Sequence, residues 1–345
     1  MRAAIIGGTG YGSIELVRLI NKHPFLEIGS VVSNSQSGSS FSEIYPHLSE
    51  IIDQPLEKFD ADTLSENNDI VFLATPSGVS SKLVPQLLKS GIKCIDLSGD
   101  FRLRSMEEYE SWYKHKPADE EYLKQATYGL SEIYPDQIKS SNLIANPGCY
   151  PTATTIGLIP ILKTNLADEK SIIIDAKSGV SGAGRGLSLT AHYSEINENL
   201  KAYKLGAHQH IPEIEQVLSD ESGNPITITF TTHLVPMTRG IMCTIYVNLK
   251  EEISTKKVID LYKQFYQESH FIRVRPEGNI PSTKEVLGSN YCDLGLHVDE
   301  RTNRLTIVSV IDNLVKGAAG QAIQNVNLIN GWNERTGLTD IPLYP

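Results

Sequence analysis

Short apolar runs alternate with amphipathic stretches over the first 150 residues of the chain. The first run, at residues 3–6, ends in glycines, and apolar side chains then recur at helical spacing through residues 14–20. Later runs of the same kind are expected to be strands: residues 28–32, 70–74, 94–97 and 143–145. Continuous apolar strands separated by helices are typical of a parallel sheet covered on both faces, so this part should be an α/β domain.

After residue 149 the pattern changes to an alternation of apolar and polar positions. Strands of this kind form mainly antiparallel sheets that have one solvated or helix-covered face. The expected strands are residues 172–174, 226–230, 241–249, 294–298 and 305–311. A helix should follow from residue 318 to about residue 329. The pattern therefore predicts an α/β domain followed by an α+β domain with a mainly antiparallel sheet.

Composition excludes several classes of protein. A length of 345 residues suggests about two domains, and the net charge of −10 argues against a general nucleic-acid partner. No apolar run approaches the roughly 18 residues that a membrane span needs, and the first run is too short for a signal-peptide core. Four cysteines without a Cys-x-x-Cys pair are no disulfide scaffold. We expect a reduced, cytoplasmic protein with no membrane partner.

A glycine-rich turn, Gly7-Gly-Thr-Gly-Tyr-Gly12, stands between the first expected strand and the first expected helix. Glycines let a backbone approach a pyrophosphate closely, and amides at a helix N-terminus face the anion. The spacing departs from the usual Gly-x-Gly-x-x-Gly, so an ordinary strand–helix turn remains the alternative. Its place at the start of a βαβ series favours a Rossmann-type dinucleotide site. The expected contacts are Gly7, Thr9, Gly10, Tyr11 and Gly12.

The second expected strand leads into a loop of hydroxyls and amides, Ser33–Gly38. An NAD site normally has a carboxylate here that binds the ribose 2′-hydroxyl. Its absence removes the repulsion that a 2′-phosphate would feel, although no arginine stands in the loop. We therefore expect NADP rather than NAD, with Ser33 among its contacts.

Cys149 follows the last strand of the first domain, in Asn146-Pro-Gly-Cys149. Pro151 suits the first turn of a helix that begins there, and the positive end of a helix dipole lowers the pKa of a thiol. We therefore expect Cys149 to be a nucleophile. The other three cysteines lie within expected strands and should belong to the core: Cys94, Cys243 and Cys292.

A nucleophilic thiol generally needs a partner for proton transfer. His208 and His210 precede a helix that should begin near Pro212, and Glu213 could accept a hydrogen bond from either ring. A structural pair of histidines is an alternative. His-x-His could also ligate a metal, but no further ligands appear at convincing spacing, so no metal is expected.

Three arginines are candidates for binding an anionic substrate. Arg185 ends a loop rich in glycine and hydroxyls, Lys177–Gly186, whose backbone could approach a ligand closely. The alternative for this segment is a flexible surface loop, and Arg102 or Arg239 could equally form a surface ion pair. The expected substrate contacts are Ser98, Arg102, Ser181, Arg185 and Arg239.

Together these motifs resemble the N-acetyl-gamma-glutamyl-phosphate reductase family of arginine biosynthesis over essentially the whole chain. The most specific are Asn146-Pro-Gly-Cys149 and His208-x-His210-x-Pro-Glu213. Ser13 is a departure, because relatives often have glycine there, but its hydroxyl could still donate to a phosphate. The supporting motifs are Ala74-Thr-Pro76, Asp96–Arg102, Lys177–Gly184, Val235–Gly240, Gly288–Asp293 and Val310–Gly320.

The resemblance implies NADPH-dependent reduction of N-acetyl-L-glutamyl 5-phosphate to N-acetyl-L-glutamate 5-semialdehyde, with release of inorganic phosphate. Cys149 would form a thioester, which accepts hydride far better than a carboxylate does. Backbone amides at the start of its helix would stabilise the oxyanion. His208 is our first choice for the general acid/base and His210 the second, with Glu213 orienting the ring. The family pattern also implies a homodimer or homotetramer.

The resemblance further implies that the C-terminal helix returns to the cofactor domain. We therefore expect residues 1–148 plus 317–345 to form the NADP-binding domain, and residues 149–316 to form the catalytic, substrate-binding and oligomerisation domain. Beyond the glycine turn and Ser33, the expected cofactor contacts are Ala74, Thr75, Pro76, Ser178, Gly179, Gly182, Asn313, Lys316 and Gly317.

Three rival functions deserve comparison. Aspartate-semialdehyde dehydrogenase shares the fold and the cysteine chemistry, but its histidine motif differs. A lysine-pathway reductase acting on a carrier-bound aminoadipyl phosphate would require a basic entrance, which Arg185 and Lys201 do not settle. A non-catalytic NADP-sensing regulator would predict lost chemistry at Cys149 or His208, and both residues are present.

Overall fold

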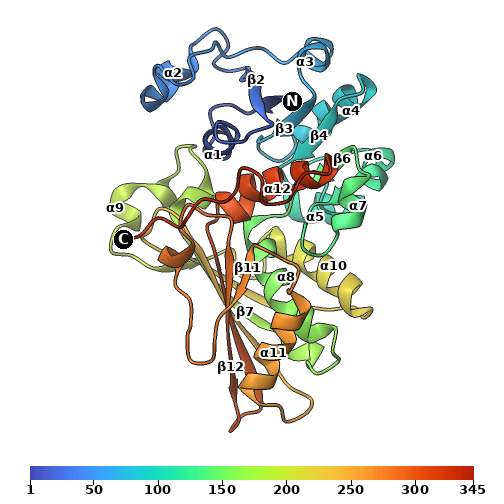
Figure 1. Ribbon diagram of the computed structural model, residues 1–345, viewed down its shortest axis with the longest axis vertical. Coiled ribbons are helices and arrows are strands. Elements are labelled where there is room, and N and C mark those ends of the chain that lie inside the picture. The colour runs from blue at the N-terminus through green and yellow to red at the C-terminus, as the bar shows by residue number, and fades with distance from the viewer. The chain divides into compact units, whose positions relative to one another are not determined.

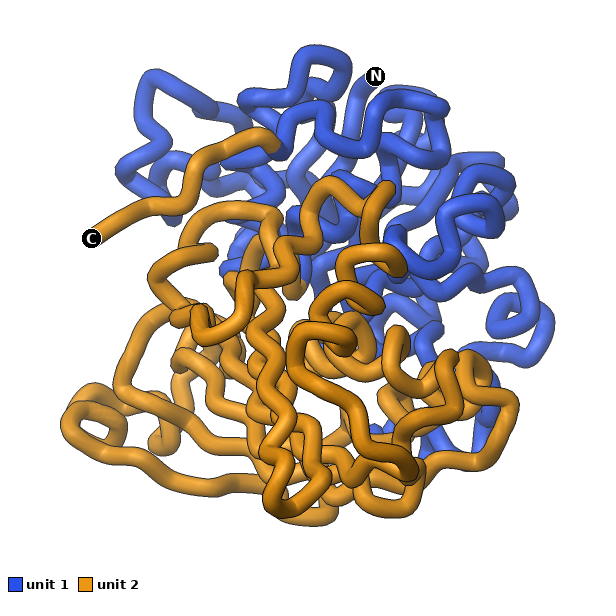
Figure 2. Tube along the Cα trace, turned by 60° about the horizontal axis from the view of Figure 1, so that its bottom comes forward, with its two compact units in different colours: residues 1–147, 318–338 blue, residues 148–317, 339–345 orange.

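The computed structural model describes residues 1–345 and divides into two compact units. The first comprises Met1–Pro147 and Ala318–Leu338, and the second comprises Gly148–Gly317 and Thr339–Pro345 (Figure 2). The last seven residues therefore lie with the second unit, whereas the sequence analysis assigned them to the first. The backbone N–H of Leu343 donates to the carbonyl of Leu287 at 2.8 Å, which ties this segment to the second unit.

The first unit is built on a six-stranded sheet with the order β2-β1-β3-β4-β6-β5, in which every neighbouring pair is parallel. Its residues are apolar toward both faces, so the predicted α/β fold is confirmed. Only β5, two residues long, was not predicted. The strands are β1 Arg2–Ile6, β2 Glu27–Val32, β3 Ile70–Leu73, β4 Lys93–Asp96, β5 Thr127–Tyr128 and β6 Leu143–Ala145.

Eight helices belong to the first unit, and the last of them comes from the C-terminal part of the chain. Gln321 in this helix donates to Gly129 O at 2.9 Å and to Ser131 Oγ at 2.8 Å. Asn325, one turn later, donates to Gly129 O at 2.8 Å. These buried hydrogen bonds hold α12 in the first unit. The helices are α1 Tyr11–Ile20, α2 Phe41–Ile44, α3 Ala61–Asn67, α4 Ser80–Lys89, α5 Met106–Tyr113, α6 Glu120–Gln125, α7 Pro135–Lys139 and α12 Gly320–Ile329.

The second unit is built on a seven-stranded sheet with the order β11-β12-β13-β10-β7-β9-β8. The β11–β12 and β7–β9 pairs are parallel and the other pairs are antiparallel, which confirms a mainly antiparallel sheet. Buried and half-buried positions alternate along β10, as its sequence predicts. The strands are β7 Ile173–Ser178, β8 Lys201–Tyr203, β9 Thr229–Leu234, β10 Ile241–Asn248, β11 Ile272–Val274, β12 Cys292–Asp299 and β13 Arg304–Ile311.

The strand expected at 226–230 begins only at residue 229. The backbone N–H of Ile226 donates to Ser219 Oγ at 2.9 Å, and that of Ile228 donates to Glu215 Oε1 at 3.0 Å. Both donors are therefore satisfied by side chains of a neighbouring helix rather than by the sheet. Alternation of apolar residues alone does not reveal such an interaction.

Three helices of the second unit, α8 Cys149–Leu162, α10 His210–Ser222 and α11 Thr255–Phe265, pack together, while the short α9 Tyr193–Ile196 stands apart (Figure 1). α8 contacts the sheet at β10 and β13 and also contacts α10 and α11. Every residue of α8 after Cys149 is buried, as expected for a helix that is apolar on all sides. Cys149 thus begins the most enclosed helix of the unit. No helix of the chain has the length and apolarity to cross a membrane.

Candidate active site

Cys149 is the first residue of α8, and Gly148 is its N-cap. Gly148 itself has no side chain that could cap the backbone amides of the first turn, which lie at the positive end of the helix dipole. Cys149 is partly exposed, whereas the other three cysteines are buried, which confirms their assignment to the core. Burial raises the pKa of the Cys94 and Cys243 thiols well above their usual range. Cys149 is therefore the one cysteine placed to react with a ligand.

The carboxylate of Glu213 joins the cap of α8 to a histidine ring. Its Oε1 accepts a hydrogen bond from the backbone N–H of Gly148 at 2.8 Å, and its Oε2 lies 2.8 Å from Nδ1 of His210. Glu213 is fully buried, and an ionised carboxylate can only accept, so the ionised form of Glu213 selects the tautomer of His210 in which Nδ1 carries the proton.

The ring of His210 also packs directly on Gly148. A Cβ added to Gly148 would lie 2.2 Å from Cε1 of His210, which no side chain could tolerate. Glycine at this position thus permits the imidazole to lie against the residue that precedes Cys149. The sequence analysis quoted Gly148 within its motif but did not identify this function.

His208 has different surroundings. Its Nδ1 accepts a hydrogen bond from the backbone N–H of His210 at 3.2 Å, and its ring meets Tyr150, Tyr203 and Phe230 edge-on. Burial, with added repulsion from His210, lowers the pKa of His208 to about 2. His208 therefore stays neutral and holds the first residue of α10 in place. The two tyrosines were not expected at the site, although Tyr150 directly follows Cys149.

Several loop residues expected to bind ligands gather at the ends of β7 and β13. Asn313 accepts from the backbone N–H of Gly240 at 2.7 Å and donates to Ser181 Oγ at 2.9 Å. A Cβ on Gly179 would lie 2.7 Å from the carbonyl oxygen of Thr238, so these loops touch through their backbones. Ser178 donates to the carbonyl of its neighbour at 3.0 Å. The cluster comprises Ser178, Gly179, Ser181, Gly182, Arg239 and Asn313.

The charged candidates of the second unit differ in exposure. Nη1 of Arg239 lies 3.6 Å from the buried carboxylate of Asp312, and Arg185 is exposed. Lys316 is fully buried, with its ammonium 5.7 Å from the centre of the Phe271 ring. Asp312, which the sequence analysis did not single out, thus holds one of the expected anion-binding side chains. No group of three or more His, Cys, Asp or Glu side chains is arranged to hold a metal ion.

The glycine-rich turn of the first unit has the features of a dinucleotide site. Gly7 has a φ of +91°, and a Cβ there would lie 2.3 Å from the carbonyl oxygen of Ala74. The N-terminus of α1 has no side-chain cap, so its amides can face a pyrophosphate. The turn stands where β1 is flanked by β2 and β3, the switch point at which such sheets bind nucleotides. The residues present therefore fit the cofactor.

Ser13 differs from its expected role. Its hydroxyl is fully buried and donates to the carbonyl of Gly7 at 2.7 Å. The Ser13 O–H, which was expected to donate to a phosphate, thus donates within the protein and stabilises the glycine turn. Thr75, beside the turn, shares a hydrogen bond with Ser80 at 2.8 Å, which joins the end of β3 to the start of α4.

Ser98 and Arg102 lie in the first unit and contact the protein itself. Ser98 donates to Asp96 at 2.9 Å, while Arg102 donates to the carbonyls of Asn146 and Leu97, each at 2.8 Å. Burial raises the pKa of Asp96 to about 7. Arg102 thus steadies the chain just before Cys149. Ser33 is also buried, and its backbone N–H donates to the carbonyl of Glu57 at 3.0 Å.

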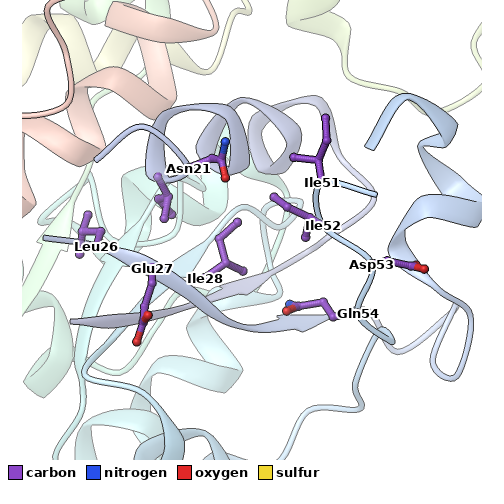
Figure 3. Close-up of a pocket in the computed structure, with 9 residues that line it drawn as sticks. Asn21, Leu26, Glu27, Ile28, Ile51, Ile52, Asp53 and Gln54 are labelled. Atoms are coloured by element: carbon purple, nitrogen blue, oxygen red, sulfur yellow. The ribbon is translucent and has the colours of Figure 1, made fainter. Parts of the chain in front are cut away.

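A cavity of about 370 Å³ lies in the first unit between the end of α1, the start of β2 and residues 51–54 (Figure 3). Figure 3 shows apolar side chains such as Ile28 and Ile52 lining it together with Asn21 and Gln54. The glycine turn lies at the opposite ends of α1 and the sheet, so this cavity is distinct from the expected dinucleotide site.

Comparison with known proteins decides the family. A model described as the NAD-binding domain of semialdehyde dehydrogenase matches residues 2–141, and one described as its dimerisation domain matches residues 149–313. N-acetyl-gamma-glutamyl-phosphate reductases of Oceanobacillus iheyensis and Bacillus subtilis are 55% and 54% identical to the whole chain and are covered over 99% and 100% of their lengths.

The chain belongs to the N-acetyl-gamma-glutamyl-phosphate reductase family. It is an oxidoreductase of the semialdehyde dehydrogenase type, and the resemblance found in the sequence is confirmed. Aspartate semialdehyde dehydrogenase II of Vibrio cholerae matches with a TM-score of 0.72 at 18% identity, over 96% of this chain and 98% of that one. The enzyme of Candida albicans, solved with NADP, matches with a TM-score of 0.72 at 14% identity, over 95% and 98%. These structures confirm the fold class.

The lowered pKa of His208 predicts a specific loss of stability in acid. The folded chain keeps His208 neutral down to about pH 2, while in the unfolded chain it titrates near its usual value of 6.5. Between these two pH values His208 is protonated in the unfolded state but not in the folded state. Protonation therefore favours unfolding, and the stability that depends on neutral His208 is fully present above about pH 6.5 and is lost as the pH falls. From about pH 7.5 to about pH 5.5 the free energy of unfolding should fall by about 1.4 kcal/mol through this residue.

His208→Gln is the matched control, because glutamine can still accept from the His210 N–H but does not titrate. Urea unfolding of both proteins across this pH range measures the difference. The wild-type chain should lose about 1.4 kcal/mol more than the variant. The same pH dependence in both proteins would contradict a neutral, buried His208.

Proposed function

We propose that this chain reduces N-acetyl-L-glutamyl 5-phosphate to N-acetyl-L-glutamate 5-semialdehyde, with release of phosphate, in arginine biosynthesis. Its family membership gives the reaction, and one structural observation supports the chemistry. Glu213 bonds both to the cap residue before Cys149 and to the ring of His210. Glu213 thus connects the ring of His210 to the residue before Cys149, and a nucleophile, a base and a group that orients the base are the components that covalent catalysis needs.

The first step is acyl transfer to Cys149. Sγ attacks the acyl carbon, the new carbon–sulfur bond forms, and the carbon–oxygen bond to phosphate breaks with its electron pair leaving on phosphate. The positive end of α8 favours the thiolate, and amides of its first turn can donate to the developing oxyanion. The product on the protein is a thioester. A bound nicotinamide dinucleotide supplies the hydride that reduces it.

We assign proton transfer to His210 rather than to His208, our first choice from sequence. Glu213 holds Nδ1 of His210 and leaves Nε2 able to take the Cys149 proton and to return it later. A general acid/base works best when its pKa lies near the operating pH. The pKa of His208 is lowered to about 2, so it is a poor carrier and is better described as a positioning residue.

We propose two surfaces for the anionic ligands. The turn Gly7–Gly12, with Ala74 and Thr75 beside it, would hold the pyrophosphate of the dinucleotide. The candidates for the carboxylate or phosphate of the substrate are Arg185, three residues after Gly182 in the chain, and Arg239, whose neighbour Gly240 donates to Asn313. Arg102 and Ser98 are better described as supports of the backbone, because their donors already meet carbonyl and carboxylate oxygens.

A homo-oligomer is also supported. The dimerisation-domain model covers residues 149–313, and five large apolar side chains of this region are exposed on one segment: Leu187, Leu189, Tyr193, Leu200 and Leu205. Exposed apolar side chains that gather into a large patch usually mark an interaction surface. We propose that a second copy of the chain covers this segment. The molar mass from light scattering on the full chain tests whether the chain is an oligomer. A monomer at micromolar concentration would contradict the assembly.

The histidine assignment predicts a clear order of damage. Cys149→Ser should abolish phosphate-dependent NADP reduction with N-acetylglutamate semialdehyde, and His210→Asn should lower kcat by roughly two to four orders of magnitude. His208→Gln keeps the hydrogen bond to the His210 N–H and should cost far less. Steady-state assays measure all three, with aspartate semialdehyde as a comparison substrate. A larger loss in His208→Gln than in His210→Asn would reverse the roles.

We propose NADP as the preferred dinucleotide, because the Ser33 loop has hydroxyls and amides where an NAD site has a carboxylate. Charge-assisted contacts to a 2′-phosphate should give NADPH at least roughly a tenfold higher kcat/KM than NADH. Ser33→Asp should reduce this preference by repelling the phosphate. Equal kcat/KM for both dinucleotides in the unaltered chain would contradict the proposal.

A further inference from the structure

The chain makes a π-helical turn at Val315–Ala319, immediately before α12. The backbone N–H of Gly317 donates to the carbonyl of Asp312 at 3.0 Å, five residues earlier in the chain. Turns with this hydrogen bond are rare and occur frequently at functional sites. Such geometry needs a local cause, and the residues that the turn contacts supply one.

Gly317 lies directly against the proposed nucleophile. A Cβ built on Gly317 would be 2.7 Å from Cβ and 3.2 Å from Cα of Cys149, and 3.3 Å from a methyl group of Ile311. Its φ lies outside the left-handed region, so an L-residue could adopt this backbone conformation. Glycine is therefore required by the close approach and not by the dihedral angle. The turn brings bare backbone against the Cα–Cβ bond of Cys149.

The carboxylate of Asp312 holds the turn in place. Oδ1 accepts from the backbone N–H of Leu314 at 2.8 Å and of Val315 at 3.2 Å, and Oδ2 accepts from the N–H of Gly288 at 2.8 Å. Asp312 is fully buried, so these bonds are shielded from water and hold the backbone firmly. The turn is thus tied both to its own start and to the loop at Gly288.

We propose that the π-helical turn is a positioning element for the nucleophile, in which Gly317 backs the Cα and Cβ of Cys149 and restricts where its thiol can lie. The proposal rests on the proposed function only in taking Cys149 as the reactive thiol. It gives Gly317 a different role from the one expected from sequence, which was a contact with the dinucleotide cofactor. Gly317 is a positioning residue, and Asp312 supports it.

Gly317→Ala tests the contact, and Gly157→Ala is the matched control. Gly157 lies in the same helix as Cys149, and its added Cβ would lie 3.1 Å from the flexible end of Ile245. The readout is the rate at which iodoacetamide alkylates Cys149, located by peptide mass, in protein without substrate. Because a misplacement of about 1 Å can cost two orders of magnitude, we expect Gly317→Ala to change this rate at least tenfold. Gly157→Ala should leave it within about twofold, and NADPH affinity by fluorescence titration should be unchanged in both.

An unchanged alkylation rate in Gly317→Ala would overturn the proposal, and a selective loss of NADPH affinity would return Gly317 to the cofactor site. This assay needs no acyl phosphate, so it does not depend on the substrate assignment.

Should Gly317→Ala fold poorly, the thermal unfolding midpoint gives a second test. Cys149→Gly removes the Cβ that the new methyl group meets, so the fall in midpoint caused by Gly317→Ala should be smaller in that background. An equal fall in both backgrounds would overturn the contact.

Discussion

The buried carboxylate of Glu213 is the constraint on which the site depends. Removing a carboxylate from water is costly unless both oxygens find donors, and here each oxygen has one. One donor is the backbone N–H of Gly148 and the other is the ring of His210. Because these donors come from the cap of α8 and the first turn of α10, the Glu213 carboxylate fixes the start of one helix relative to the start of the other. The nucleophile and the base are positioned by the same group.

The remainder of the second unit makes this arrangement rigid. From Tyr150 to its end α8 is buried against the sheet and two other helices, so Cys149 at its start cannot shift without disturbing the core. Two glycines then allow close approach: the ring of His210 packs on Gly148, and the Cα–Cβ bond of Cys149 packs on Gly317. The site is thus defined as much by missing side chains as by those present.

Apolar periodicity was enough to predict most of the fold, because the central strands of the first sheet are buried on both faces and strands such as β10 alternate between buried and half-buried positions. It failed where side chains replaced the sheet as hydrogen-bond partners, as at Ile226 and Ile228, and where β5, β8 and β11 are too short to have a period. The glycine turn and Cys149 were identified as candidates because both stand at strand–helix junctions, which a linear pattern reveals.

Roles within the site depend on burial and on contacts between distant residues, which spacing does not contain. His208 and His210 are two residues apart, yet one is enclosed by aromatic rings and the other is bonded to Glu213. The sequence around Ser13 likewise did not indicate that its hydroxyl would donate to the carbonyl of Gly7. The involvement of Asp312 was equally hidden, because its partners are backbone amides.

The central claim is that Cys149 carries the acyl group. Mass spectrometry of the whole chain, mixed with the acyl phosphate and no dinucleotide, tests it most directly. We expect one acyl group per chain, on the peptide that contains Cys149, with an equal amount of phosphate released. An acyl group on any other cysteine would contradict this assignment. So would a chain that stays unmodified but, once NADPH is added, releases phosphate and aldehyde together.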